Sequence, residues 1–534
     1  MNEASHEQEP VAAAGRDAPF VLRSDAAPDP HQFERAELRE THTAVVFFVG
    51  DRAYKLKKPV DLGFLDYTTV QGRREACAQE VALNRRFAPD VYLGVGEVRV
   101  PHTAEPEPIV VMRRMPAERR LARLVREGAV VDDALRAVAR LLATHHAHAA
   151  RHADVDAQGT RDALASRWDA SFGQVRSLAE DDRVREDVAR IEQLALRYLA
   201  GREPLFDSRI AQGRIVDGHG DLLAEDIFCL DDGPRVLDCL EFDDHLRYVD
   251  GLDDAAFLAM DLEQLGAPES AAFFLAQYGE YSGDYAPPSL RHHYVAYRAF
   301  VRAKVCVIRA GQGAPAAAVA ARRLIAATLG HLRASVVGLT VVGGLPGSGK
   351  STLCGALADR LGVTLLSSDR LRKELAGIPV DQSAAAPYGE GLYTPEWTAR
   401  TYATLLERAT TLLSRGESVV LDASWSDSGQ REAARHVAER TGAELVALHC
   451  QSPTDTTVAR LRARAAGASD ADVEVARAMA EREAAWPEAV RVDTSGSLES
   501  AVTRALTAIR PHGAGQAPVF RRPSMEHQED RHDD

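Results

Sequence analysis

Residues 339–352 read LTVVGGLPGSGKST, a short β-branched run that leads directly into a glycine-rich loop. Gly344, Gly349, Lys350 and Ser351 match the pattern GxxxxGK[ST], and a helical pattern follows. Glycines let successive backbone N–H groups turn toward phosphate oxygens, and the N-terminus of the next helix adds partial positive charge. The stretch therefore predicts a strand, a phosphate-binding loop and a helix, which together open an α/β domain.

Individual positions of this loop carry expected contacts with a nucleotide. Lys350 is expected to reach the β- and γ-phosphates, and the Ser351 hydroxyl is expected to bind Mg²⁺. The other expected nucleotide-binding residues are Gly344, Pro346, Gly347, Ser348, Gly349 and Thr352. ATP and Mg²⁺ are therefore the expected cofactors. The alternative, a glycine-rich turn that binds nothing, is disfavoured because a strand and a helix flank the loop.

Two aspartates follow apolar runs downstream of the loop. SVVLD ends in Asp422 and VTLLSSD ends in Asp369. Ligands of doubly wound sheets bind beyond the carboxyl ends of the strands. Asp422 is therefore expected to orient the metal ion, and Asp369 to accept the proton of an acceptor hydroxyl. Each could instead be a helix cap or a solvated loop charge.

Arginines near these acids are candidates for binding anionic groups. Arg372 lies three residues after Asp369. The segment RLRAR carries Arg460 and Arg464 on one face of an expected helix, from which they could close over the γ-phosphate. The alternative is a solvated basic helix face.

The segments GLPGSGKST, SSDRLRKELAG, VVLDASW and RLRAR together resemble the P-loop kinases of the gluconate kinase, polynucleotide kinase and zeta-toxin type. The resemblance covers about 335–510. It implies an α/β P-loop NTPase domain with a parallel sheet flanked by helices, and transfer of the γ-phosphate of ATP. No motif identifies the acceptor.

A second group of acids lies in DGHGDLLAEDIFCLDDGPRVLDCLEFDD, residues 217–244. In it, Asp221 of a His-Gly-Asp triplet is followed by Asp226 and Asp238. This spacing follows the logic of protein-kinase sites, in which one aspartate serves the acceptor hydroxyl and later side chains hold Mg²⁺. Upstream, the strand AYKLKKPV places Lys55 and Lys57 on one face, so either could pair with phosphates.

This second group resembles the aminoglycoside phosphotransferase family, whose loop reads HGD-LHxxN with an acid downstream. The match implies that Asp221 is the catalytic base, that Asp238 is a metal ligand, and that Glu80 pairs with the strand lysine. The asparagine of the family is Asp226 here, a metal-binding candidate, and its second histidine is Leu223. Three converging carboxylates would repel one another without metal.

The likeness extends over about 35–330 and implies an α+β bilobal kinase-like N-terminal domain. Members of a related family fuse such a domain to a P-loop domain. The change in sequence texture near 335 marks the expected boundary. The expected organisation is a flexible tail at 1–30, a kinase-like domain at 31–334 with an N-lobe at 31–115 and a helical lobe at 116–334, a P-loop kinase domain at 335–510, and a disordered tail at 511–534.

Smaller features are expected to be structural. A hairpin turn is expected at Gly50-Asp51, and a helix at about 70–87. The crowded histidines of THHAH (144–148) and His292-His293 lack metal-ligand spacing, so a partly exposed helix surface is expected for them. Asp250, Asp253 and Asp254 are expected to cap a helix or to support the scaffold.

Composition restricts the class of protein. The chain has 534 residues, with 64 Lys and Arg against 79 Asp and Glu, a formal charge of −15. The acidic balance disfavours a nucleic-acid partner. Six cysteines without a CxxC pair indicate reduced thiols, and no apolar run reaches the roughly 18 residues of a membrane span. A cytoplasmic protein without a membrane partner is expected, and the oligomeric state is not indicated.

The expected function is transfer of the γ-phosphate of ATP to a small hydroxylated acceptor, with both domains as candidate phosphotransferases. A second reading is an ATP-hydrolysing regulatory or sensor protein whose N-terminal domain binds ligand without phosphotransfer. The departures at Leu223 and Asp226 motivate it. A third reading, phosphorylation of nucleic-acid 5′ ends, is disfavoured by the acidic charge and the lack of a basic, aromatic groove pattern.

Overall fold

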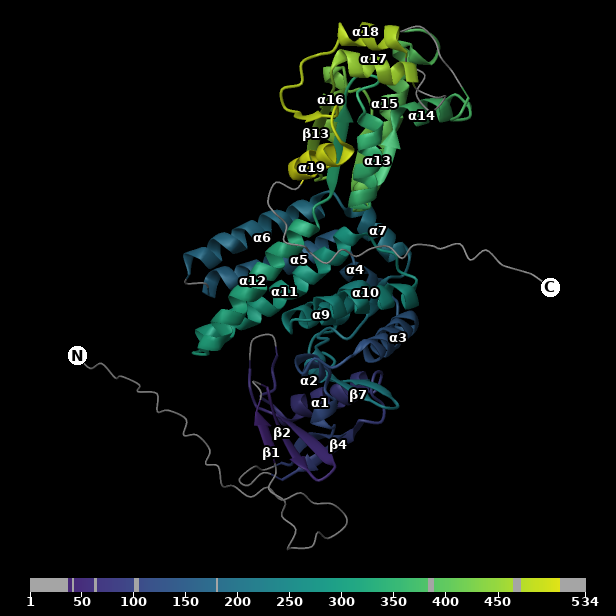
Figure 1. Ribbon diagram of the computed structural model, residues 1–534. Helices are drawn as coiled ribbons and strands as arrows, with labels where there is room; N and C mark the ends of the chain where they lie inside the picture. The colour runs from purple at the N-terminus through teal and green to yellow at the C-terminus, as the bar shows by residue number, and fades with distance from the viewer. Residues whose placement is uncertain are drawn as a thin grey trace, which may run out of the picture. The chain divides into compact units, whose positions relative to one another are not determined.

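The computed structural model describes residues 37–40, 43–61, 65–99, 105–178, 181–382, 389–463 and 472–509. The chain divides into two compact units (Figure 1). The first unit comprises Met1–Arg120 and Asp226–Asp244, and the second comprises Leu121–Glu225 and His245–Asp534. The two tails and Arg464, for which the sequence made predictions, lie outside the described residues.

The first unit is built on a five-stranded sheet in the order β1-β2-β3-β5-β4, in which every neighbouring pair is antiparallel. The strands β2 and β3 join at Gly50, whose φ of 55° is in the left-handed region, so the predicted hairpin is confirmed. The edge strand β1 is an addition to the predicted strands. The strands are β1 (Glu37–Glu40), β2 (Ala44–Val49), β3 (Arg52–Lys57), β4 (Tyr92–Val98) and β5 (Glu107–Arg113).

The helix α1 (Val70–Asn84) packs on this sheet against β4 and β5. Cys77 and Val81 of the helix meet Val110 and Met112 of β5 in a buried cluster. A hairpin of β7 (Ile227–Leu230) and β8 (Gly233–Val236) belongs to the same unit. The acidic segment after the His-Gly-Asp triplet therefore folds with the sheet, although the sequence places it among helical residues.

The second unit begins with a helical region. Trp168 forms its aromatic centre and stacks on Phe172 at a centroid distance of 5.3 Å. Three of the helices start with proline, which has no N–H to leave unpaired in the first turn. The elements are α2 (Leu121–Arg126), α3 (Asp132–His148), α4 (Ala153–Gln158), α5 (Arg161–Leu178), α6 (Asp182–Ala200), α7 (Glu203–Ala211), α8 (Asp244–Arg247), α9 (Gly251–Gln264), α10 (Pro268–Ser282), α11 (Pro288–Gly311) and α12 (Pro315–Ala334), with a two-stranded sheet of β6 (Ile215–Asp217) and β9 (Tyr248–Asp250).

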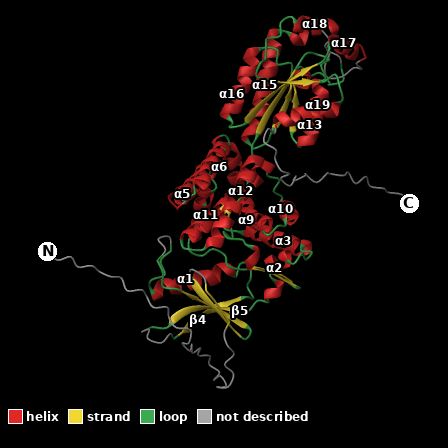
Figure 2. Cartoon of the chain, turned by 60° about the vertical axis from the view of Figure 1, so that its left-hand side comes forward, coloured by secondary structure: helices red, strands yellow, loops and turns green. Residues whose placement is uncertain are grey.

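The same unit ends in a five-stranded parallel sheet in the order β11-β12-β10-β13-β14, with helices on both faces (Figure 2). This is the predicted α/β P-loop architecture, and β14 adds a strand to the four that the sequence predicts. The strands are β10 (Gly338–Gly343), β11 (Thr364–Ser367), β12 (Val419–Asp422), β13 (Glu444–Gln451) and β14 (Val490–Asp493). The helices are α13 (Lys350–Leu361), α14 (Ser368–Leu375), α15 (Pro395–Ser414), α16 (Ser428–Arg440), α17 (Thr454–Ala463), α18 (Val473–Ala480) and α19 (Leu498–Ile509).

The register of this sheet aligns the carboxyl ends of three strands. Asp422 at the end of β12 pairs in register with Val342 of β10 on one side and with Ser367 of β11 on the other. Beneath this edge, Leu353 and Leu357 of α13 pack on Val420 and Leu448 of the strands. The buried contact holds the loop before α13 at the edge where β10, β11 and β12 end.

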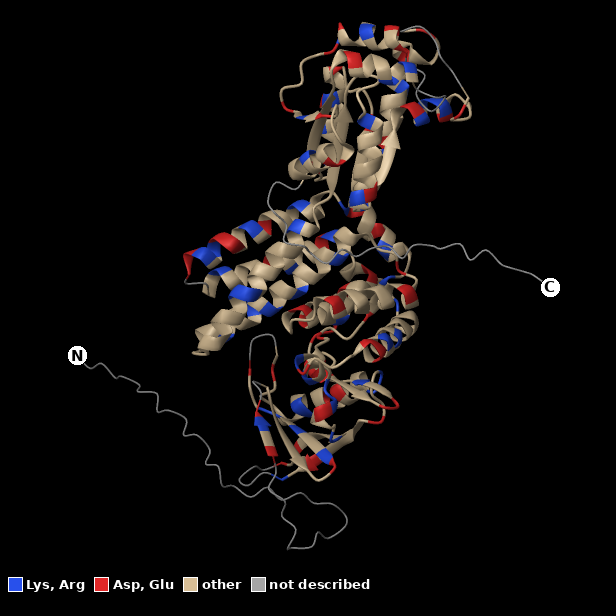
Figure 3. Ribbon diagram, viewed as in Figure 1, with Lys and Arg blue, Asp and Glu red and all other residues tan. Residues whose placement is uncertain are grey.

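Charge and thiols match the sequence analysis. Basic and acidic residues interleave along the helices of each unit (Figure 3). All six cysteines are free thiols, and five of them are buried. Among the described residues, none of the helices combines the length and the apolar character that crossing a bilayer requires.

Candidate functional site

The glycine-rich loop has the backbone that its sequence predicts. Gly344, Gly347 and Gly349 have φ values of 138°, 79° and 86°, which side chains other than glycine rarely adopt. The helix α13 begins at Lys350, directly after Gly349. The loop therefore presents successive backbone N–H groups at a helix N-terminus, the arrangement that binds phosphate.

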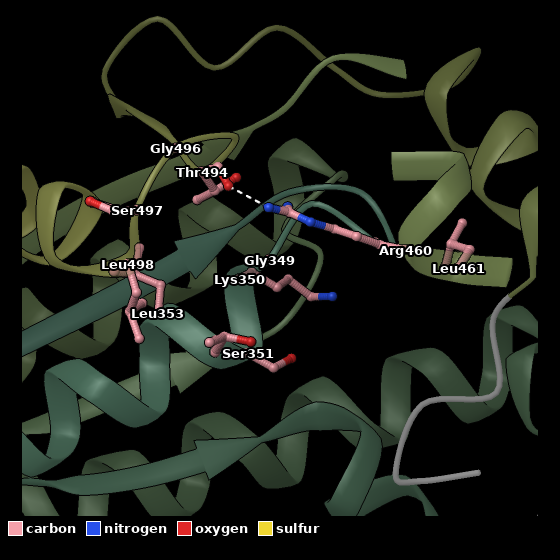
Figure 4. A pocket seen from close by; sticks show the side chains of 13 residues that line it. Gly349, Lys350, Ser351, Leu353, Arg460, Leu461, Thr494, Gly496, Ser497 and Leu498 are labelled. Atoms are coloured by element: carbon pink, nitrogen blue, oxygen red, sulfur yellow. Dashed lines mark hydrogen bonds between the residues drawn. The ribbon is translucent and has the colours of Figure 1, made fainter. Parts of the chain in front are cut away.

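A cavity of about 360 Å³ opens at this loop. Figure 4 shows the side chains of Lys350, Ser351 and Arg460 around it, and a hydrogen bond that joins Arg460 to Thr494. Its lining residues are Gly347, Gly349, Lys350, Ser351, Thr352, Leu353, Arg460, Leu461, Thr494, Gly496, Ser497, Leu498 and Ala501. The loop, α17 and the segment between β14 and α19 thus enclose one cavity, and Arg460 is among the residues that line it.

Thr494, just after β14, ties the loop to Arg460. Its hydroxyl donates to the carbonyl oxygens of Ser348 and Gln451, and its own carbonyl accepts from Arg460 Nη2 at 2.6 Å. Arg460 Nη1 and Ser348 Oγ are buried and find no hydrogen-bond partner among the described residues. Buried polar atoms are normally satisfied, so these two fit contacts with an anionic ligand.

Ser351 and Asp422 are the side chains of the P-loop site that could hold Mg²⁺. Asp422 is buried at the end of β12, in register with the last residues of β10, and Ser351 is the second residue of α13. A hydroxyl and a carboxylate fit a cation that prefers oxygen ligands and takes its remaining ligands from phosphates and water. No group of three His, Cys, Asp or Glu side chains able to hold a metal ion by themselves occurs in the described part of the chain.

Asp369 and Arg372 lie beside the same edge of the sheet. The run VTLLSSD was predicted as a strand that ends at Asp369, but β11 ends at Ser367 and Asp369 lies in the first turn of α14, because the helix begins at Ser368. Arg372 Nη1 is 3.5 Å from Asp369 Oδ1, and its guanidinium lies 4.5 Å from the ring centroid of Tyr393. The pair therefore offers a carboxylate and a buried cation next to each other.

Tyr402 and Trp425 support this edge, and sequence analysis missed both. Trp425 is buried with a φ of 53°, and its backbone N–H donates to the Tyr402 hydroxyl at 3.2 Å. Burial raises the pKa of Tyr402, so the hydroxyl stays protonated. A bulky residue in the left-handed region costs roughly 1–3 kcal/mol and marks functional sites. The signal available in the sequence was a tryptophan three residues after the predicted metal-binding aspartate.

In the first unit, both strand lysines contact Glu80. Lys55 Nζ is 2.9 Å from Glu80 Oε1, and Lys57 Nζ is 2.8 Å from Glu80 Oε2. The Lys55 side chain is 15% exposed, whereas that of Lys57 is 2% exposed. Lys55 also contacts Asp238 Oδ1 at 2.7 Å, whereas Lys57 contacts Glu241 Oε1 at 2.6 Å. Lys55 is therefore the lysine that a bound phosphate can reach.

Asp238 has the features of a ligand-binding acid. Its side chain is 50% exposed, and its φ of 63° is unusual for a residue other than glycine. The strands β7 and β8 pair Ile227 with Val236, and the Asp226 carbonyl accepts from the Leu237 N–H at 2.9 Å. The open end of this hairpin thus brings Asp226 and Asp238 near each other. Two carboxylates beside a lysine fit a Mg²⁺-bound phosphate group.

In the second unit, Asp254 holds the His-Gly-Asp loop. Its carboxylate accepts from the backbone N–H groups of His219 and Gly220 at 2.7 and 2.9 Å, and His146 Nε2 lies 3.0 Å away. Burial alone would raise the pKa of Asp254, but these hydrogen bonds and the neighbouring histidines hold it well below its usual range. Asp254 is therefore a scaffold carboxylate.

The expectation that the crowded histidines lie on a partly exposed helix surface is wrong for three of them. His146, His292 and His293 are buried. His146 Nδ1 lies 2.9 Å from the Tyr278 hydroxyl, and His292 Nδ1 lies 2.9 Å from His331 Nδ1. The helix faces that carry them pack against other helices, which period alone could not show.

Asp221 follows this anchored loop. Gly220 before it has a φ of 84°, and the Asp221 side chain is 38% exposed, with Arg302 Nη1 at 3.8 Å. Asp221 is thus a partly exposed carboxylate at the end of the segment that Asp254 holds.

Two solved structures of kinases align with parts of the chain. A choline/ethanolamine kinase family protein from Mesorhizobium loti covers 57% of this chain and 94% of its own length, with 16% identity and a TM-score of 0.37. A gluconokinase from Sinorhizobium meliloti 1021 covers 33% of this chain and 92% of its own length, with 23% identity and a TM-score of 0.25.

Sequence comparison places the chain more closely. Residues 339–485 match the AAA domain family. The uncharacterized protein Rv2004c of Mycobacterium tuberculosis is 45% identical over 470 residues, which cover 88% of this chain and 94% of that protein. The uncharacterized protein Mb2027c of Mycobacterium bovis matches to the same extent. The chain therefore belongs to the family of these mycobacterial proteins.

Proposed function

We propose that this protein is an ATP-dependent phosphotransferase that transfers the γ-phosphate of ATP to a small hydroxylated acceptor at its P-loop domain. The observation that carries the proposal is the cavity at the glycine-rich loop, which follows β10 at the sheet edge where β12 ends in Asp422 and where α14, which bears Asp369, begins after β11. A P-loop protein that only hydrolyses ATP needs the cavity and the metal-binding Asp422, but it does not need an acceptor site. Asp369 with Arg372 adds a carboxylate and a cation suited to an acceptor.

The chemistry assigns a role to each side chain. Lys350 binds the β- and γ-phosphates, and Arg460, held by the Thr494 carbonyl, offers its second nitrogen to the same charge. Asp369 takes the proton of the acceptor hydroxyl as that oxygen bonds to the γ-phosphorus and the bond to the β-phosphate oxygen breaks. Arg372 holds an anionic group of the acceptor. Ser351 and Asp422 would hold Mg²⁺, which neutralises phosphate charge when bound.

We propose a second Mg²⁺–nucleotide site in the first unit, formed by Lys55, Asp226 and Asp238 and oriented by Glu80. Support comes from the Lys55 contacts with Glu80 and Asp238 at 2.9 and 2.7 Å. Asp221 is proposed as the base for phosphotransfer by the N-terminal region. A bifunctional enzyme follows if both sites transfer phosphate.

The experiment measures ADP release by the full-length protein with Mg²⁺ and ATP, alone and with D-gluconate, glycerol, choline or an oligonucleotide with a free 5′ hydroxyl. At least one small hydroxylated compound should stimulate release. Asp369→Asn should remove the stimulation while fluorescent ATP still binds, because the carboxylate serves the acceptor. Asp359→Asn, an exposed acid on α13, is the matched control.

Two outcomes would contradict the proposal. ADP release that no acceptor stimulates, and that Asp369→Asn leaves unchanged, would favour an ATP-hydrolysing regulatory protein. Stimulation by the oligonucleotide alone would favour nucleic-acid phosphorylation. Asp221→Ala tests the N-terminal region in the same assay. Any ADP release that remains in Lys350→Ala should come from that region, and Asp221→Ala should remove only this part.

A further inference from the structure

Two lysines of one strand share a single buried carboxylate in the first unit. Glu80 is fully buried, and each of its oxygens contacts a different ammonium group, that of Lys55 or that of Lys57. Burial alone would raise the pKa of Glu80, but the two lysines hold it below its usual value. The nucleotide site as proposed above needs only one of these lysines, so the second requires an explanation.

Lys57 lies in a closed environment of its own. Its Nζ contacts Glu241 Oε1 at 2.6 Å, the Tyr67 hydroxyl lies 3.1 Å from the same Glu241 oxygen, and the ammonium lies 4.9 Å from the Tyr67 ring centroid. Burial raises the pKa of Tyr67 to about 12, so the hydroxyl remains a donor. Lys57 is thus buried among Glu80, Glu241 and Tyr67, and a ligand in solvent would not reach its ammonium group.

We propose that Lys57 is a positioning residue that fixes the Glu80 carboxylate, so that the Lys55–Glu80 pair is already assembled before nucleotide binds. In protein kinases the equivalent lysine–glutamate pair must be in place for activity, and movement of its helix controls it. Here a second lysine, held by Glu241, keeps Glu80 in position when Lys55 turns from Asp238 toward a phosphate.

The helix that carries Glu80 is anchored at both ends, which agrees with a fixed pair. Near its start, Arg73 makes two hydrogen bonds to Glu107 of β5, at 2.7 and 2.9 Å. In its last turn, Asn84 accepts from the Cys239 backbone N–H at 2.9 Å. Together with the contact between Lys57 and Glu80, these hydrogen bonds anchor α1 near its start, in its middle and in its last turn. A helix anchored in this way should keep Glu80 beside Lys55.

Net charge allows a test that separates positioning from simple stabilisation. Lys55, Lys57, Glu80, Asp238 and Glu241 together carry a formal charge of −1. The double substitution Lys57→Met with Glu241→Leu removes one charge of each sign and leaves the total unchanged. Replacing a buried ion pair with apolar side chains of similar volume is often neutral for stability. Glu80 Oε2 nevertheless loses its charged partner.

The experiment measures binding of fluorescent ATP with Mg²⁺ to full-length protein carrying Lys350→Ala, which silences the P-loop site. Lys55→Met should abolish the remaining binding. The protein that carries only Lys350→Ala is the parent for these comparisons. The double variant should melt at a temperature near that of the parent but bind the nucleotide at least about tenfold more weakly. Loss of a residue that orients a ligand-binding side chain typically has an effect of this size. The conservative variant Lys57→Arg should keep most of the affinity that the double variant loses, because a guanidinium can contact both Glu80 and Glu241. Lys58→Met, at a neighbouring lysine paired with Glu40, should change nothing.

The inference rests on the proposed nucleotide site in the first unit. Nucleotide binding by the parent tests the site, and the comparison of the double variant with the parent tests the inference. A parent that binds no nucleotide overturns the site and the inference together. A parent that binds, with a double variant within twofold of it, overturns the inference alone. If the double variant does not fold, Lys57→Gln replaces it in the same comparison, since the glutamine amide removes the charge and keeps N–H donors.

Discussion

Replacing Asp254 with asparagine should loosen the loop that carries Asp221. The Asp254 carboxylate accepts from the N–H groups of His219 and Gly220 and contacts His146, all in a buried site. Asparagine keeps the shape but replaces one carboxylate oxygen with an NH₂ group. At least one of the two backbone N–H groups then faces another donor, and the acceptor of the remaining hydrogen bonds is neutral rather than negatively charged.

The size of the effect follows from these bonds. A hydrogen bond to a charged group contributes about 1.5–3 kcal/mol, and a buried donor without a partner costs about 1–3 kcal/mol. A loss of about 3 kcal/mol is therefore expected for the opening of the loop. Because about 1.4 kcal/mol corresponds to a factor of ten, the loop amides should exchange with solvent roughly a hundred times faster.

Hydrogen exchange followed by mass spectrometry measures this directly, on peptides that cover 217–221. Peptides that cover the glycine-rich loop at 344–350 report any general loosening, and Asp133→Asn, at a highly exposed carboxylate, is the control variant. Equal exchange at 217–221 in Asp254→Asn and Asp133→Asn would refute the anchoring role.

The same carboxylate predicts a pH dependence. The pKa of Asp254 in the folded protein is held below its value of about 3.9 in an unfolded chain. Its stabilising contribution is therefore complete above about pH 4 and is lost as the pH falls toward the folded pKa. Exchange at 217–221 should accelerate below pH 4 more in the wild type than in Asp254→Asn, after correction for the intrinsic rate. Equal acceleration would contradict this linkage.

Three further substitutions test other contacts. Thr494→Val removes the hydroxyl that donates to the Ser348 carbonyl and should weaken ATP binding to the P-loop domain about fivefold, whereas Thr494→Ser should not, as fluorescence titration would show. Gly347→Ala would place a Cβ 2.9 Å from the Thr457 carbonyl oxygen at a φ of 79° and should abolish that binding. Arg209→Gln leaves two buried carboxylates without their cation and should lower the unfolding free energy by about 3–5 kcal/mol, measured by urea denaturation.

Much of the fold follows from local pattern. The hairpin at Gly50, the helix that carries Glu80 and the alternation of strands and helices after residue 338 were all predicted and are all present. The edge strands β1 and β14 were missed because short strands at the edge of a sheet have a weak periodic signal. The end of β11 was predicted two residues too late, at Asp369, because the polar residues after Leu366 fit the end of a strand as well as the first turn of a helix.

The sequence by itself determined the phosphate-binding loop, since its function depends on the backbone of eight consecutive residues and on the helix that follows. Tertiary structure decided which side chains meet there and elsewhere. Only the fold brings Thr494 to Ser348 and Asp254 to His219, and only burial distinguishes Lys55 from Lys57 on one face of β3. Local motifs specify backbone geometry, whereas the partner of a buried charge depends on which distant element packs over it.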